Sequence, residues 1–154
     1  MAELVSKIIE QEEDTLSGRF LIFKVGDDSY GIELGYVTEI VSVPKITKVP
    51  GLPEYLVGII NLRGSIIPVM DIRLRFNMPK IEYNDRTCII ITQIDGMDVG
   101  FVVDAVCEVA NIPAESIVPP PETSKNKSNF IRGIIKSGDN IYLLIDYQSI
   151  LKIT

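Results

Sequence analysis

An internal repeat constrains the fold of this chain more than any other feature. The stretch 58–76 (GIINLRGSIIPVMDIRLRF) aligns without a gap to 133–151 (GIIKSGDNIYLLIDYQSIL), so that Gly58 matches Gly133. The stretch Phe20–Ile40 aligns in the same way to Ile89–Val109. Two collinear blocks predict two copies of one unit, each with about five short strands and a terminal helix.

The repeat and the strand-favouring composition together predict the fold class. A unit of about 70 residues buries little apolar surface by itself, and its short Ile- and Val-rich strands can remove exposed edges by curling into a barrel. We expect a mainly β fold of two similar five-stranded SH3-like β-barrels packed side by side, with short helices, an apolar seam and a binding groove between them. The expected parts are a flexible N-terminal tail (1–17), a first barrel (about 18–80), a second barrel (about 85–145) and a C-terminal helix (about 146–152).

Composition excludes several classes of function. The 154 residues contain no histidine, which removes the commonest general base and the commonest metal ligand. A net charge of −6 is unfavourable for a nucleic-acid surface, and no apolar run reaches the roughly 20 residues of a membrane span. Cys88 and Cys107 lie in apolar surroundings and are expected to be buried and reduced, in a cytoplasmic protein. We expect no catalytic site, no metal and no cofactor.

Residues that occur in both copies are expected to serve the fold. Gly58 and Gly133 suit a close approach of two backbones. Asp71 and Asp146 each precede a short helical run, where a carboxylate accepts hydrogen bonds from free N–H groups.

Residues that occur in one copy only are candidates for function. Arg63 lies in an Asn-Leu-Arg-Gly turn that the second copy lacks, and its guanidinium needs a carboxylate partner among apolar strands. Glu39, in the same unit, is the predicted partner, and the pair would hold the turn at the mouth of the groove. The alternative is a solvent-exposed arginine without a functional role. Arg73 and Arg75 follow on the short helix, either as a solvated face or as a contact to an acidic partner.

The stretch 58–76 closely resembles the CheW family, the coupling proteins of bacterial chemotaxis. The family signature G-(I/V)-x-N-L-R-G-x-I-(I/V)-P-(V/I)-x-D-(L/I)-R-x-(R/K)-F is met at every fixed position. The resemblance extends over residues 19–151, through Phe20–Ile40 and Asp85–Val109. The family often has a glycine after the final Phe, where this chain has Asn77, a residue that tolerates the left-handed conformation.

The resemblance implies a fold of two five-stranded barrels and a function without chemistry. The family couples the cytoplasmic tip of methyl-accepting chemoreceptors to the regulatory domain of the histidine kinase CheA, with no nucleic acid and no membrane insertion. It implies a cytoplasmic protein that is recruited to membrane-associated receptor arrays. The 154 residues leave no room for the added domains of CheV or CheA, which favours a free-standing adaptor.

The resemblance also implies which residues couple receptor and kinase. They match the family's motif positions and are Val37, Glu39, Ile40, Gly58, Leu62, Arg63 and Gly64. Ile46 and Val49, on a proline-bounded edge segment, are candidates for the kinase interface, and the family makes a second kinase contact through the loop at 118–123.

Three other functions compete with this interpretation. A CheW-like scaffold could serve another receptor–kinase pathway. A small enzyme could use Arg63 with Glu39 or Asp71, but the absence of histidine and of a phosphate-binding motif argues against it. A nucleic-acid-binding barrel is disfavoured by the negative charge.

Overall fold

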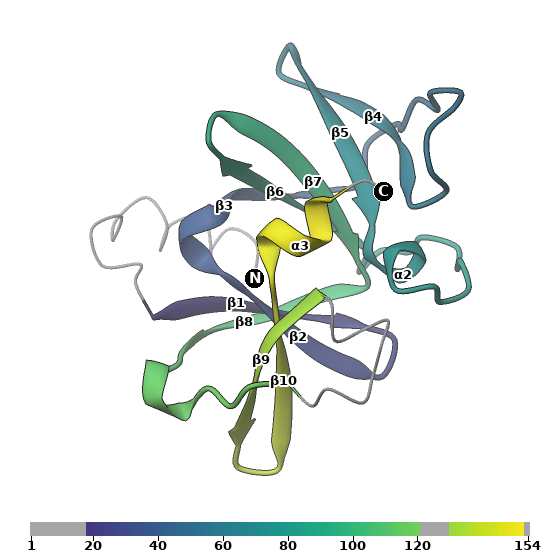
Figure 1. Cartoon of the computed structure of the whole chain (residues 1–154). Helices are drawn as coiled ribbons and strands as arrows, with labels where there is room; N and C mark the ends of the chain where they lie inside the picture. Colours follow the sequence, from purple (N-terminus) through teal and green to yellow (C-terminus); the bar gives the residue numbers. More distant parts are fainter. Residues whose placement is uncertain (1–17, 121–129, 153–154) are drawn as a thin grey trace.

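The computed structural model describes residues 18–120 and 130–152 and shows two five-stranded sheets (Figure 1). Sheet A has the strand order β8 (Ala105–Asn111), β1 (Arg19–Val25), β2 (Asp28–Glu33), β10 (Asn140–Ile145), β9 (Ile131–Ser137). Sheet B has the strand order β3 (Val37–Ser42), β6 (Cys88–Ile94), β7 (Met97–Val103), β5 (Ser65–Asp71), β4 (Leu56–Leu62). Short helices complete the described chain: η2 (Leu34–Tyr36), α2 (Ile72–Arg75), η3 (Ala114–Ser116) and α3 (Tyr147–Leu151). The predicted mainly β class with two five-stranded units is confirmed.

The boundaries predicted for the two barrels are wrong. Each sheet takes strands from both halves of the sequence, because the hairpin β1–β2 joins β8, β9 and β10, while β6–β7 joins β3, β4 and β5. Neither 18–80 nor 85–145 therefore forms a unit by itself. Since the two copies have the same pattern of strands and turns, each hairpin finds equivalent pairing partners in either copy, and alignment of the repeat cannot distinguish the two arrangements.

The exchanged hairpins pair at matching positions of the internal repeat in both sheets. β2 pairs in parallel with β10, and β7 pairs in parallel with β5. The registers match, since Gly31 lies opposite Leu144 in sheet A and Gly100 opposite Val69 in sheet B. The hairpins β4–β5 and β9–β10 extend at opposite ends of the molecule (Figure 1). The two sheets therefore have equivalent strand orders and registers.

The predicted apolar seam forms the main core. Its largest cluster of buried residues draws Leu21, Phe23 and Tyr30 from sheet A and Ile40, Ile90 and Phe101 from sheet B. Two smaller clusters lie within the individual sheets, around Ile22 and Leu144 in sheet A and around Ile60 and Val69 in sheet B. Burial of this apolar surface is the dominant favourable term in joining the sheets.

Both predicted helix caps are present. Asp71 accepts a hydrogen bond from the Arg73 N–H at 2.9 Å, and Asp146 accepts one from the Ser149 N–H at 3.3 Å. The C-terminal helix α3 corresponds to the one predicted at about 146–152. Its Tyr147 hydroxyl lies 2.8 Å from the buried Thr92 hydroxyl of β6, so this helix ties the end of the chain to sheet B.

Other predictions at single residues have mixed outcomes. Asn77 adopts the left-handed conformation expected of it, with φ of 61°. Cys88 and Cys107 are free thiols, as predicted, but each is half-buried. The predicted tail at 1–17 and the second half of the predicted kinase contact at 118–123 lie outside the described residues. In the described part of the chain no helix is both long and apolar enough to span a bilayer.

Candidate functional site

The site is built on the tight turn that connects β4 to β5. Arg63 and Gly64 occupy its two central positions with φ of 51° and 87°. Two consecutive left-handed residues define the turn type that best matches the twist of a β-hairpin. The Asn61 side chain accepts a hydrogen bond from the Gly64 N–H at 2.9 Å and closes the turn. The Asn-Leu-Arg-Gly sequence is therefore a rigid platform that presents the Arg63 side chain.

Arg63 makes the predicted ion pair with Glu39. The guanidinium of Arg63 donates a hydrogen bond to Glu39 Oε1. The Arg63 side chain is 70% exposed and that of Glu39 is 25% exposed, so the pair lies at the surface. An ion pair this accessible contributes at most about 1 kcal/mol to stability. Its charges remain available to a partner protein.

The ion pair borders a polar hollow of about 430 Å³ on sheet B. Thr38 and Glu39 contribute from β3, and Gln93 and Asp98 from the hairpin β6–β7. Gln93 donates a hydrogen bond to Asp98 at 2.9 Å across that hairpin. The residues that line this hollow all belong to sheet B or to its hairpin turns. The binding groove between the barrels, with the ion pair at its mouth, remains a prediction.

A β-bulge in strand β3 explains how Glu39 faces outward between buried neighbours. The register with β6 shifts between Val37 and Glu39, which places both Val37 and Ile40 in the core between the sheets. Val37 is 3% exposed and Ile40 is 7% exposed. A bulge adds one residue and reorients the side chains that follow it. Val37 and Ile40, two of the predicted coupling residues, are therefore core residues that fix the position of Glu39.

Gly58 also supports the site from inside the fold. It has φ of 149°, and a Cβ at this position would lie 2.2 Å from the carbonyl oxygen of Thr47. Thr47 and Ile59 exchange two backbone hydrogen bonds of 2.9 Å across this contact. The predicted close approach of two backbones is confirmed here. Leu62, the remaining predicted coupling residue, is half-buried beside the turn.

The two predicted kinase-interface candidates face different environments. Ile46 packs against the apolar cluster inside sheet B. Val49 is 38% exposed and lines a separate hollow of about 290 Å³ together with Leu52. Val49 is therefore the more exposed of the two, and Ile46 is half-buried.

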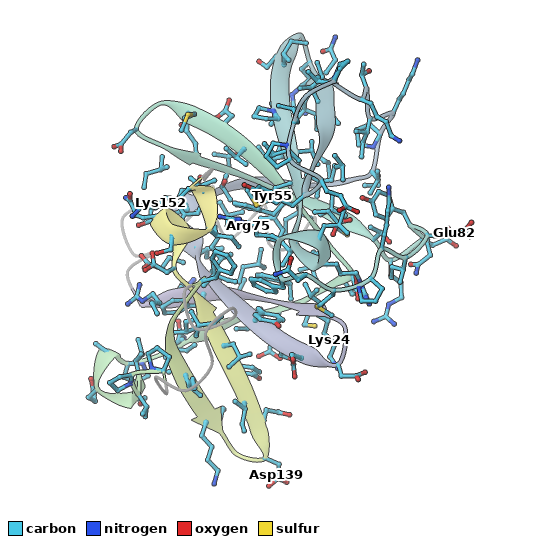
Figure 2. All side chains as sticks on the ribbon, turned by 45° about the vertical axis from the view of Figure 1, so that its right-hand side comes forward. Lys24, Tyr55, Arg75, Glu82, Asp139 and Lys152 are labelled. Atoms are coloured by element: carbon cyan, nitrogen blue, oxygen red, sulfur yellow. The ribbon has the colours of Figure 1, made fainter. Side chains whose placement is uncertain are left out.

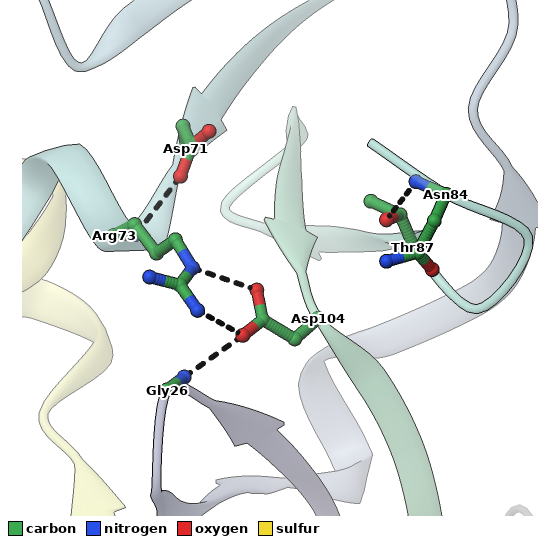
Figure 3. A network of polar contacts seen from close by, with 6 residues as sticks. All are labelled: Gly26, Asp71, Arg73, Asn84, Thr87 and Asp104. Atoms are coloured by element: carbon green, nitrogen blue, oxygen red, sulfur yellow. Dashed lines mark hydrogen bonds and ion pairs between the residues drawn. The ribbon is translucent and has the colours of Figure 1, made fainter. Parts of the chain in front are cut away.

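Arg73 does not lie on a solvated helix face, contrary to one of the two predictions for it. It makes a bidentate ion pair with Asp104, with N–O distances of 3.0 and 2.6 Å, and Asp104 also accepts a hydrogen bond from the Gly26 N–H at 2.8 Å (Figure 3). Burial opposes the charged form of Asp104, but the hydrogen bonds from Arg73 and Gly26 outweigh it and lower the pKa of this carboxyl. The network joins α2 of sheet B to the β1–β2 turn of sheet A.

Arg75 is held inside the molecule as well. Its guanidinium lies 4.3 Å from the centre of the Tyr55 ring and 4.5 Å from that of Phe130. It donates a hydrogen bond to the Ile150 carbonyl at 3.0 Å and another to the Lys152 carbonyl. Figure 2 shows Arg75 beside Tyr55 and Lys152. Neither arginine of α2 is therefore free for an acidic partner.

Sequence reasoning did not find several polar residues that the structure brings together. Asp104 and Gln93 belong to the second copy, and only the exchange of hairpins places them near α2 and β3. Tyr83, from the connector between α2 and β6, donates a hydrogen bond to the buried Asp71 at 2.8 Å. Burial and the hydrogen bond to Asp71 raise the pKa of the Tyr83 phenol. Within 18–120 and 130–152 no cluster of three or more potential metal ligands occurs.

The structure is thus a β scaffold of two five-stranded sheets that exchange hairpins. Its charged surface site is the turn at Arg63, which is ion-paired to Glu39. The chain belongs to the CheW family, since the family model described as the CheW-like domain matches residues 19–154.

The chain resembles named relatives over most of its length. It is 32% identical to the chemotaxis protein CheW of Klebsiella aerogenes, over 90% of this chain and 84% of that protein. It is 34% identical to the chemotaxis protein CheW of Bacillus subtilis, over 86% of each chain. The crystal structure of the scaffolding protein TtCheW from Thermoanaerobacter tengcongensis superposes with a TM-score of 0.83 at 37% identity, covering 89% of this chain and 94% of that one.

Proposed function

We propose that this chain is a chemotaxis adaptor that couples transmembrane chemoreceptors to the histidine kinase CheA. Its family membership and the chemotaxis proteins it resembles support this function. The observation that carries the proposal is the Glu39–Arg63 pair, because Arg63 is a charged residue of the β4–β5 turn that the matching turn in the other copy lacks.

The adaptor acts by binding and performs no reaction. Glu39 and Arg63 present opposite charges from two elements held in fixed relation by the hairpin turn and by the buried Val37 and Ile40. A rigid charged site loses little conformational freedom on binding, and complementary charges favour specificity and the rate of association. Holding receptor and kinase in one geometry lets a change in either partner bias the other.

We propose that the predicted coupling residues fall into two groups, those that contact a partner and those that maintain the fold beneath. Glu39, Leu62, Arg63 and Gly64 are proposed to contact a partner, and Val37, Ile40 and Gly58 to maintain the shape of that surface. Val49 is proposed to contact the kinase regulatory domain, together with the half-buried Ile46, which packs against the apolar cluster of sheet B. The protein is proposed to be cytoplasmic and recruited to receptor arrays through these contacts.

A binding experiment with purified components tests the function. The full chain is titrated with a chemoreceptor cytoplasmic fragment and, separately, with the CheA regulatory domain. Arg63→Glu is expected to weaken binding to at least one partner by roughly tenfold or more, since a repulsive charge replaces an attractive one. Lys136→Ala, at the opposite hairpin tip, is the matched control and should retain binding. If the unmodified chain binds neither partner, the proposed function is wrong.

A charge exchange distinguishes a direct contact from a structural role of the pair. The double variant Glu39→Arg with Arg63→Glu can reform the ion pair with its polarity reversed. If the pair only orients the turn, the double variant should bind as the unmodified chain does. If the partner contacts each charge, the double variant should bind as weakly as Arg63→Glu.

A further inference from the structure

The polar hollow beside the Glu39–Arg63 pair lies where sheet B curls so that its two edges meet. The edge strands of this sheet are β3 and β4. Glu39 lies on β3 and Arg63 follows β4 directly, so their ion pair joins the two edges. The hollow of about 430 Å³ lies between this pair and the hairpin β6–β7. None of its lining residues adjoins 1–17, 121–129 or 153–154.

The hollow has an apolar floor and a polar rim. Ile67 and Ile91 line it and are both 3% exposed, so they supply buried apolar surface at its base. The side chains of Thr38, Gln93 and Asp98 contribute polar groups to the lining. A long side chain with a polar end suits this combination, because its methylene stem can cover apolar surface while its end meets polar groups.

The hydrogen-bonding groups left over at the rim are mainly acceptors. The Thr38 hydroxyl donates its hydrogen to a backbone carbonyl of β6 at 3.2 Å, so its remaining capacity is that of an acceptor. The Gln93 amide donates to Asp98 Oδ1 at 2.9 Å, which leaves Oδ2 of this carboxylate. Arg63 donates to Glu39 Oε1, which leaves Oε2. An occupant of the hollow therefore needs several hydrogen-bond donors.

The charge of the hollow favours a cation. Glu39 and Arg63 compensate each other, whereas the half-buried Asp98 is hydrogen-bonded to a neutral amide. In the described part of the chain no cationic side chain forms an ion pair with Asp98. The carboxylate of Asp98 thus gives the hollow a negative charge that a positively charged occupant would balance.

The matching surface of sheet A differs from sheet B in each of these respects. Tyr142 is 8% exposed and belongs to the apolar cluster of sheet A, against which Cys107 packs. A hydroxyl and an ammonium replace the carboxylate and the amide of the hollow, so the duplicated fold does not require them. In the alignment Tyr142 takes the place of Ile67, Cys107 that of Thr38, Lys24 that of Gln93 and Ser29 that of Asp98.

We propose that the hollow receives an arginine side chain of the partner protein that contacts Glu39 and Arg63. This inference rests on the proposed function for the choice of partner. The stem of the arginine covers Ile67 and Ile91, and its guanidinium donates hydrogen bonds to Asp98 and to the acceptors beside it. Arginine fits better than lysine because its planar guanidinium has five N–H donors in a fixed arrangement that matches a carboxylate.

Binding measurements on the full chain test the proposal. The chemoreceptor cytoplasmic fragment and the CheA regulatory domain are titrated separately. Asp98→Asn retains the shape of the side chain and removes its charge, so binding to the partner that Arg63→Glu also weakens should fall roughly tenfold. Asp95→Asn removes the same charge from the turn of the same hairpin, outside the hollow, and should retain binding. Equal losses for the two variants, or no loss for Asp98→Asn, would overturn the proposal.

An exchange of residues between the sheets gives a second matched comparison. Gln93→Lys introduces the residue of sheet A and places an ammonium in the hollow, so it should weaken binding more than Asp98→Asn does. Lys24→Gln makes the reciprocal change on sheet A and should retain binding. Circular dichroism and urea denaturation check that each variant folds. The proposal is wrong if Gln93→Lys, correctly folded, binds as the unmodified chain does.

A double-mutant cycle identifies the arginine on the partner. Each exposed arginine of the partner fragment is replaced by alanine, and its binding to the unmodified chain and to Asp98→Asn is measured. One of these replacements should remove the effect of Asp98→Asn, because the two residues then no longer interact. An effect of Asp98→Asn that persists with every replacement would exclude an arginine as the occupant.

An NMR titration examines the hollow without either partner. The probe is Nα-acetyl-arginine amide, and the neutral citrulline derivative is its control. The arginine compound should shift the backbone amide signals of Gln93 and Asp98 in the unmodified chain but not in Asp98→Asn. Equal shifts from the two compounds, or no shift from either, would overturn the proposal. Failure of the chain to bind receptor and kinase would refute the proposed function, whereas this titration would still decide whether the hollow binds a guanidinium.

Discussion

Each strand of sheet A matches the strand at the same place in sheet B in the internal repeat. The two sheets differ in one hairpin turn and in the residues that cover the apolar cluster of each sheet. Both have a bulge at matching positions, at Thr38 in β3 and at Cys107 in β8. Sheet B adds the ion-paired turn at Arg63 and is closed by Tyr83, whereas sheet A has a turn without that arginine and a hollow beside Phe20. The comparison indicates that the duplicated fold tolerates change at turns and closures, where the chain meets solvent, more readily than along the paired strands.

The largest difference between matching positions is expected at the two buried glycines. Gly58→Ala places a Cβ 2.2 Å from a backbone oxygen at φ of 149°, so relief requires movement of two strands. We expect a loss of about 3 kcal/mol or more in the free energy of unfolding. Gly133→Ala meets Cγ2 of Ile117 at 2.3 Å and the Val118 carbonyl oxygen at 3.3 Å. Its closest contact is a side chain and not a backbone atom, so a smaller loss of about 2 kcal/mol is expected. Urea denaturation of both variants measures the difference, and equal losses would contradict this interpretation.

The Arg73–Asp104 network should have the next largest effect on the free energy of unfolding. It connects sheet B to sheet A, and the second copy has no equivalent ion pair. Asp104→Asn is expected to destabilise the protein by about 2 kcal/mol at pH 7, since a mostly buried guanidinium loses its charged partner. The lowered pKa of Asp104 means that the unfolded chain binds its proton more readily. This stability is therefore complete above the unfolded pKa near 4 and is lost as the pH falls further.

Denaturation of the unmodified chain and of Asp104→Asn from pH 7 to pH 3 measures this contribution. The difference in unfolding free energy between the two should shrink as the pH decreases. A difference that stays constant over this range would show that the carboxylate charge is not what stabilises the contact between the sheets.

Closure of sheet B by Tyr83 should make a smaller contribution. Tyr83→Phe retains the ring but leaves the buried Asp71 without its hydroxyl donor, and we expect a loss of about 1 kcal/mol. The raised pKa of Tyr83 predicts that this contact persists below the unfolded pKa near 10 and is lost as the pH rises through the higher folded value. Ultraviolet titration of the phenols compares the unmodified chain with the variant. Ionisation of Tyr83 at the pH of a free tyrosine would contradict the prediction.

The smallest effect on stability is expected at the surface ion pair. Arg63→Ala removes a guanidinium that is 70% exposed, so the free energy of unfolding should change by less than about 0.5 kcal/mol. Binding to receptor or kinase should nevertheless decrease. A large loss of stability, measured by urea denaturation, would instead assign Arg63 to the structural group with Arg73.

Several features of the fold follow from neighbouring residues and were predicted correctly. The Ile- and Val-rich composition predicts the strands. The Asn-Leu-Arg-Gly turn is present, with Arg63 and Gly64 in the left-handed conformation, and Asp71 and Asp146 begin their helices. The Glu39–Arg63 pair was also predictable, because an arginine present in only one copy needs a partner in its own unit. Each of these predictions depends on local conformation or on a difference between the copies.

Tertiary structure alone decided which copy of each hairpin completes each sheet. Both copies present the same register and pattern, so pairing within a copy and pairing across copies look identical in one-dimensional sequence. That choice brings Asp104 to Arg73, Ile150 to Arg75 and Arg132 to Glu33. The sequence specifies strands, turns and caps because these depend on adjacent residues. The partners of the buried and rim charges depend on contacts between distant segments, which form only when the two sheets pack together.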